Sequence, residues 1–184
     1  MKLNIPTMLT LARILMLPVI VLIFYLPYPW ARPACCAVFL IAAITDWLDG
    51  YLARKWNIES DFGAFLDPVA DKLMVATVLI LLVEDAATWW LTLPAIIIIG
   101  REITISALRE WMASVGSRAK VAVSYLGKVK TTMQITALAM LLYKLDLFGL
   151  PIYTVGIGAL YIAAAITIWS MMDYLTVAFR PVSD

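Results

Sequence analysis

Histidine is absent from this sequence of 184 residues, and cysteine occurs only as the adjacent pair Cys35 and Cys36 within an apolar stretch. These absences exclude metal sites built from histidine and cysteine, catalysis by a cysteine–histidine pair, and a disulfide framework. Charge is also scarce, since only 15% of the residues are Asp, Glu, Lys or Arg, against about 25% in ordinary soluble domains. Any metal ion bound by this chain is therefore expected to have oxygen ligands.

The charges nearly cancel, because 14 Lys and Arg residues stand against 13 Asp and Glu residues, a net charge of +1. The chain has no basic excess with which to bind a nucleic-acid backbone, so no nucleic-acid partner is expected. Hydrophobic residues make up 64% of the chain, against roughly 45–50% in soluble domains. With no repeat or linker-like tract, this composition predicts a single membrane domain over residues 1–184.

Six mostly apolar stretches have about the 20-residue length that a helix needs to cross a bilayer. Arg13 interrupts the first stretch and no small-residue cleavage site follows it. We therefore interpret this stretch as a helix that the protein retains, not as a signal peptide. Short connections on one side carry most of the basic residues, such as Arg54 and Arg118, whereas Arg32 and Lys144 lie on the other side. By the positive-inside rule, both termini are then cytoplasmic. The fold class predicted is an all-α, polytopic membrane protein with helices over residues 7–28, 32–54, 62–83, 89–110, 123–144 and 151–177.

Four aspartates lie inside or at the ends of the otherwise apolar second and third helices. Asp46 and Asp49 are three residues apart, and Asp67 and Asp71 are four apart, so each pair shares a helical face. A charged residue at mid-helix costs about 2.5–3.5 kcal/mol to insert, so these carboxylates need counter-charge. If the two helices form an antiparallel hairpin, the four converge, and two Mg²⁺ or Mn²⁺ ions would neutralise them. The alternative for any one of them is a salt bridge to a basic residue.

The segment from Asp46 to Asp71 fits the pattern D-x2-D-G-x2-A-R-x8-G-x3-D-x3-D at every defined position. In this it resembles the CDP-alcohol phosphotransferase family, and the resemblance extends over essentially the whole chain. It implies a membrane enzyme that transfers the phosphatidyl group of CDP-diacylglycerol to an alcohol and releases CMP. It also implies that the four aspartates bind two metal ions, that Asp71 acts as the base, and that Gly50, Ala53 and Arg54 bind the CDP donor. Helix packing is the alternative role for Gly50 and Ala53.

A second group of charged residues lies on the fourth and fifth predicted helices and on the connection between them. Its basic members are suited to binding the phosphate of an acceptor such as sn-glycerol 3-phosphate. Topology signalling and snorkelling at the membrane surface are the alternative. Glu102 is interpreted as the neutraliser of a neighbouring helix cation. The basic members are Arg101, Arg109, Arg118, Lys128 and Lys130.

Two other functions stay open at this point. The same chemistry could use another acceptor, inositol phosphate or serine. The motif does not distinguish these acceptors, because its residues act on the CDP donor that all of these reactions have in common. A divalent-cation transporter would also carry carboxylates at membrane depth, but the chain shows no inverted pair of broken helices. The expected location is the inner membrane of a bacterium, with the active site facing the cytoplasm, and a homodimer is one of the open oligomeric states.

Overall fold

The computed structural model describes residues 5–56, 61–114 and 125–178, except for certain side chains within those ranges. All six predicted helices are present, and each end lies within four residues of its predicted position. In the described ranges the only β-structure is an isolated bridge between Leu147 and Leu150. The helices are α1 (Ile5–Phe24), α2 (Ala31–Trp56), α3 (Asp61–Ala86), α4 (Trp89–Ser114), α5 (Tyr125–Tyr143) and α6 (Ile152–Ala178).

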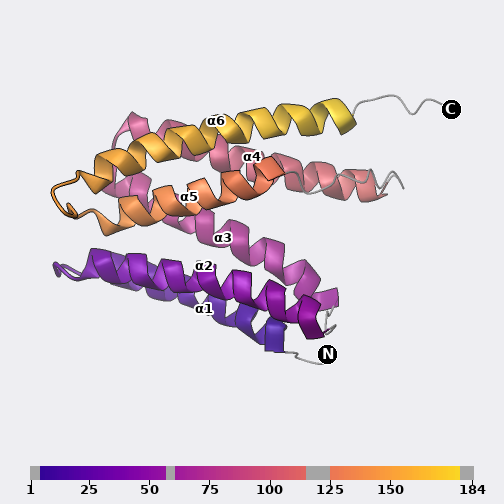
Figure 1. Ribbon diagram of the computed structural model, residues 1–184, viewed down its shortest axis with the longest axis horizontal. Coiled ribbons are helices and arrows are strands. Elements are labelled where there is room, and N and C mark those ends of the chain that lie inside the picture. Colours follow the sequence, from indigo (N-terminus) through magenta and orange to yellow (C-terminus); the bar gives the residue numbers. More distant parts are fainter. Residues whose placement is uncertain (1–4, 57–60, 115–124, 179–184) are drawn as a thin grey trace.

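The helices run back and forth along one bundle, so that the start of α1 and the end of α6 lie at the same end (Figure 1). α1 packs against both α2 and α3, while α6 packs against both α4 and α5. Contacts of α2 with α5 and of α3 with α4 join the two groups. α2 and α3 contact each other at few positions, so the hairpin considered from the sequence is bridged by α1 rather than closely packed.

Polar side chains lie inside the bundle and many large apolar side chains lie outside. Arg13 is fully buried and Lys130 is 4% exposed, whereas Leu22 and Ile103 are 71% and 64% exposed. This distribution is typical of a protein whose surroundings are lipid, because charged groups in a membrane face the bundle interior. Among the described residues, four helices (α1, α2, α4 and α6) are long and apolar enough to cross a membrane.

The end of the bundle opposite the aspartates is held together by a cluster of charges. Asp85, at the end of α3, accepts hydrogen bonds from Arg32 and from Lys144, the latter over 2.7 Å. The Arg32 guanidinium also lies 3.6 Å from the centre of the Phe24 ring. The sequence placed Arg32 and Lys144 on the same side of the membrane, and in the structure both contact the Asp85 carboxylate. Asp85 thereby links the α1–α2, α3–α4 and α5–α6 connections.

The tight contact between α5 and α6 depends on Gly156, where an added Cβ would lie 3.0 Å from Met140 Cβ and 3.1 Å from Leu141 Cγ. We expect Gly156→Ala to lower the free energy of unfolding by about 1–3 kcal/mol, because this position has no room for a methyl group. Gly158→Ala is the control, since nothing lies within 4 Å of its added Cβ. Thermal unfolding in detergent micelles measures both, and equal stability of the two variants would refute this packing argument.

Candidate active site

The candidate site begins with Arg13, which α1 places between the two helices that carry the aspartates. Its Nη1 atom lies 2.7 Å from Asp46 Oδ1 on α2 and 2.8 Å from Asp71 Oδ1 on α3. Both carboxylates therefore meet at a single nitrogen. The Arg13 side chain is fully buried, whereas those of Asp46 and Asp71 are 39% and 47% exposed. The aspartates thus form the wall of an open site, and the arginine supports them from inside the bundle.

Asp67 joins the same site through a second residue of α1. The Thr10 hydroxyl donates a hydrogen bond to Asp67 Oδ1. Thr10 and Arg13 are three residues apart, so they lie on one face of α1. From this face Thr10 contacts Asp67 and Arg13 contacts Asp71. Sequence reasoning noted Arg13 as an interruption of an apolar stretch and assigned no role in the site to Arg13 or Thr10. A charged residue inside a predicted span was the available signal, because such residues are rare in lipid and usually functional.

The chemistry of this donor set suits a hard divalent cation, since Asp46, Asp67 and Asp71 offer only carboxylate oxygens. Asp46 and Asp71 already converge on a cation, the guanidinium of Arg13. The side chains that the structure describes do not by themselves include a group of three ligands close enough to hold an ion. The fourth predicted ligand, Asp49, has its backbone in α2, and its side chain lies outside the described set.

The predicted donor-binding residues lie on the last turns of α2. Gly50 is half-buried in that helix, one turn beyond Asp46. The side chains of Ala53 and Arg54 lie outside the described set, so their expected contacts with the CDP group stay predictions.

The predicted acceptor cluster is partly assembled where α4, α5 and α6 meet. Lys130 Nζ on α5 donates a hydrogen bond of 2.5 Å to Glu102 Oε1 on α4. Arg101 Nη1 lies 3.3 Å from the same carboxylate oxygen, and Arg101 Nη2 donates a hydrogen bond of 3.1 Å to Ser170 Oγ on α6. Glu102 is therefore the neutraliser of both cations.

The other predicted members of the basic group are less closely placed. Arg109 is exposed on α4, two turns beyond Arg101. Arg118 and the Lys128 side chain fall outside the part of the chain that the structure describes.

The aspartate site and the basic cluster lie on neighbouring helices, since α3 contacts both α4 and α5. Each site includes a buried cation, Arg13 in the first and Lys130 in the second.

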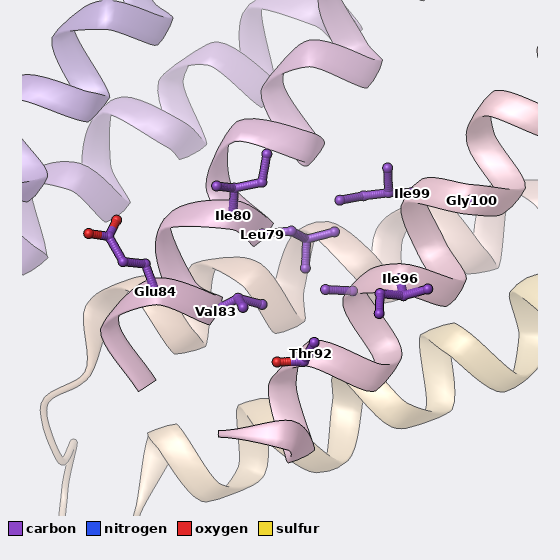
Figure 2. A pocket seen from close by; sticks show the side chains of 9 residues that line it. Leu79, Ile80, Val83, Glu84, Thr92, Ile96, Ile99 and Gly100 are labelled. Atoms are coloured by element: carbon purple, nitrogen blue, oxygen red, sulfur yellow. The ribbon is translucent and has the colours of Figure 1, made fainter. Parts of the chain in front are cut away.

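A cavity of about 520 Å³ between α3 and α4 is not the chemical site. Its lining is almost entirely apolar, with Leu79, Ile96 and Ile99 around the space in Figure 2. The Thr92 hydroxyl is bonded to the Thr88 carbonyl, and Glu84 accepts a hydrogen bond from Tyr25. The cavity thus presents no group suited to phosphate chemistry.

Known proteins resemble this chain along its full length. Residues 3–169 match the model of the family described as CDP-alcohol phosphatidyltransferase. A relative from Sodalis glossinidius is 58% identical over 179 residues, which cover 97% of this chain and 96% of the relative. A relative from Pectobacterium atrosepticum is 55% identical over 178 residues, covering 97% and 96% of the two chains. A third, from Shigella flexneri serotype 5b, is 53% identical over all of both chains. Each is named CDP-diacylglycerol–glycerol-3-phosphate 3-phosphatidyltransferase.

Proposed function

Because the chain belongs to the CDP-alcohol phosphatidyltransferase family, we propose that it transfers the phosphatidyl group of CDP-diacylglycerol to sn-glycerol 3-phosphate. The products are phosphatidylglycerophosphate and CMP, and the reaction is a step of phospholipid synthesis. The observation that carries this proposal is the meeting of Asp46 and Asp71 at Arg13, in an apolar bundle that also holds a separate basic cluster. The aspartates are suited to the chemistry at the reacting phosphate, and the basic cluster is suited to binding a phosphorylated acceptor.

In the proposed reaction an acceptor hydroxyl attacks the phosphorus that bears the diacylglycerol. Asp71 takes the proton of that hydroxyl, because a half-exposed carboxylate at the site wall can reach an incoming alcohol. A new phosphorus–oxygen bond forms to the acceptor, and the bond between that phosphorus and the CMP oxygen breaks. Arg54 supplies positive charge toward the departing CMP, which carries the developing negative charge.

The four aspartates Asp46, Asp49, Asp67 and Asp71 would hold the two Mg²⁺ or Mn²⁺ ions expected for this family. Bound there, these ions would neutralise the carboxylates and stabilise the charge on the transferred phosphate. Thr10 and Arg13 would keep Asp67 and Asp71 in place from the protein side. The pairing of Arg13 with two of the four carboxylates supports this assignment, because it holds them together independently of any ion.

The proposal is tested by reconstituting the purified protein in liposomes containing CDP-diacylglycerol, with Mg²⁺ and radiolabelled glycerol 3-phosphate. We expect label to enter the lipid fraction, and excess chelator to stop its transfer. Absence of label in the lipid despite folded protein would contradict the proposed function. Transfer that persists undiminished in chelator would contradict the role of the aspartates as metal ligands.

Lys130 provides a test of the acceptor site, where Arg101, Arg109, Arg118 and Lys128 are also proposed to serve. A charge-assisted hydrogen bond is worth about 1.5–3 kcal/mol, so Lys130→Gln should raise the KM for glycerol 3-phosphate roughly tenfold or more. The KM for CDP-diacylglycerol should change little. Lys144→Gln is the control, because that lysine binds Asp85 at the opposite end of the bundle. If only the donor KM moved, Lys130 would belong to the CDP site.

We further propose six membrane spans in the bacterial inner membrane, with both termini and the active site on the cytoplasmic side. The positive-inside distribution supports this orientation. So does the position of Asp46 toward the end of α2 and of Asp71 toward the start of α3, because these helix ends lie at the bundle end that holds the start of α1 and the end of α6 (Figure 1). A water-soluble acceptor would enter from the cytoplasm, whereas the lipid donor would arrive laterally from the bilayer.

A further inference from the structure

α6 carries two hydroxyl groups one turn apart, and one of them meets α4. Ser170 Oγ accepts the hydrogen bond from Arg101 Nη2 over 3.1 Å. Thr167 lies three residues earlier, on the same face of the helix, and is fully buried. Neither residue belongs to the family pattern that identifies the aspartates, and sequence reasoning gave α6 no site residue.

The Thr167 hydroxyl is unusual within this bundle, because it is buried and has no hydrogen-bond partner among the residues that the structure describes. Helical Ser and Thr residues satisfy their hydroxyls by bonding the carbonyl four residues earlier. Thr92, Thr104 and Ser106 do so in this structure. A buried hydroxyl without a partner costs free energy and calls for a reason, such as a bound ligand or water.

The reason lies in what surrounds these hydroxyls. Arg101, held by Ser170, shares the carboxylate of Glu102 with the ammonium of Lys130. Two cations from two helices and the Ser170 hydroxyl of a third helix therefore meet in one small region, with Thr167 one turn away along α6. A phosphate ester has several acceptor oxygens, and its binding by arginine depends on the orientation of the planar guanidinium.

We propose that Thr167 and Ser170 form part of the acceptor site, an inference that rests on the proposed function. Ser170 is a positioning residue that fixes the guanidinium of Arg101 toward the acceptor phosphate. Thr167, one turn earlier, gives its unpaired hydroxyl to a water that enters with the acceptor, which requires the packing that now buries this side chain to open locally. α6 thereby joins α4 and α5 in recognising the acceptor, a phosphorylated small polyol.

The test measures both Michaelis constants for Ser170→Ala, Ser170→Thr, Thr167→Val and Thr167→Ser in detergent micelles at fixed surface concentration of CDP-diacylglycerol. We expect Ser170→Ala and Thr167→Val to raise the KM for glycerol 3-phosphate roughly three- to tenfold, with the donor KM unchanged. Ser170→Thr and Thr167→Ser keep the hydroxyls and should stay within about twofold of wild type. Thr154→Val, which removes an exposed hydroxyl at the far end of α6, is the control.

The outcomes separate this inference from the proposed function. If the wild-type protein releases no CMP with glycerol 3-phosphate, the proposed function fails. If the wild type is active but Ser170→Ala leaves the acceptor KM unchanged, the positioning role of Ser170 is wrong. If Thr167→Val raises the unfolding temperature without changing the acceptor KM, its hydroxyl is only an unsatisfied group and has no part in binding. Equal changes in both Michaelis constants would indicate a general structural defect and also overturn the proposal.

Discussion

The Asp71→Asn variant is expected to lose turnover by about 10²–10⁴-fold, the usual contribution of a general base, while it still binds the CDP lipid. The substitution removes the group proposed to take the acceptor proton. It keeps the shape of the side chain and an oxygen that can accept the hydrogen bond from Arg13 Nη1, now 2.8 Å from Asp71 Oδ1. The geometry of the site should therefore persist while the chemistry stops.

Turnover is measured as CMP release, and donor binding as the shift in unfolding temperature on adding CDP-diacylglycerol. Asp146→Asn is the matched control, because Asp146 is an exposed carboxylate in the α5–α6 connection and should not affect either quantity. Parallel loss of donor binding and turnover in Asp71→Asn would assign Asp71 to donor binding rather than to proton transfer. Retained turnover would remove it from the reaction altogether.

The Arg13→Met variant is expected to lose about a hundredfold in kcat, although Arg13 is buried and has no direct part in the reaction. Arg13 is the residue through which Asp46 on α2 and Asp71 on α3 are held together, and these two helices contact each other at few positions. Without it, the two carboxylates repel one another and move apart. A displacement of about 1 Å at a reacting centre is enough for a loss of this size.

Arg13→Lys should recover part of the activity, because an ammonium can still approach both carboxylates but lacks the fixed shape of the guanidinium. Arg32→Met is the control, since Arg32 lies at the opposite end and its partner Asp85 keeps Lys144. Circular dichroism and unfolding temperature establish that each variant is folded. If Arg13→Met is folded and as active as wild type, Arg13 does not position the aspartates.

The helices were predictable because each one corresponds to an apolar stretch of the sequence between two polar segments. Pro29 and Pro33 mark the first break, and Gly149 and Pro151 mark the last. How the helices pack was not predictable in the same way. Nothing in the apolar stretch of residues 5–24 indicates that α1 packs against both α2 and α3, because membrane helices associate through shape and a few polar contacts.

The site was predictable where spacing sets the geometry and not where contacts cross between helices. Asp67 and Asp71 share a face by their separation of four residues, and α1 does meet both. Arg13, however, lies 33 residues before Asp46, and no local pattern links the two positions. The pairing of Lys130 with Glu102 and the contact of Arg101 with Ser170 likewise depend on the way α4, α5 and α6 pack.

The most direct test of the proposed function is the release of CMP by the reconstituted protein with CDP-diacylglycerol, Mg²⁺ and a panel of acceptors. The panel compares glycerol 3-phosphate with glycerol, serine and inositol phosphate at equal concentrations. Recognition of the acceptor phosphate by Arg101 and Lys130 predicts rapid CMP release with glycerol 3-phosphate and little with glycerol or serine. Release that is as fast with glycerol or serine, or that occurs with inositol phosphate and not with glycerol 3-phosphate, would contradict the proposal.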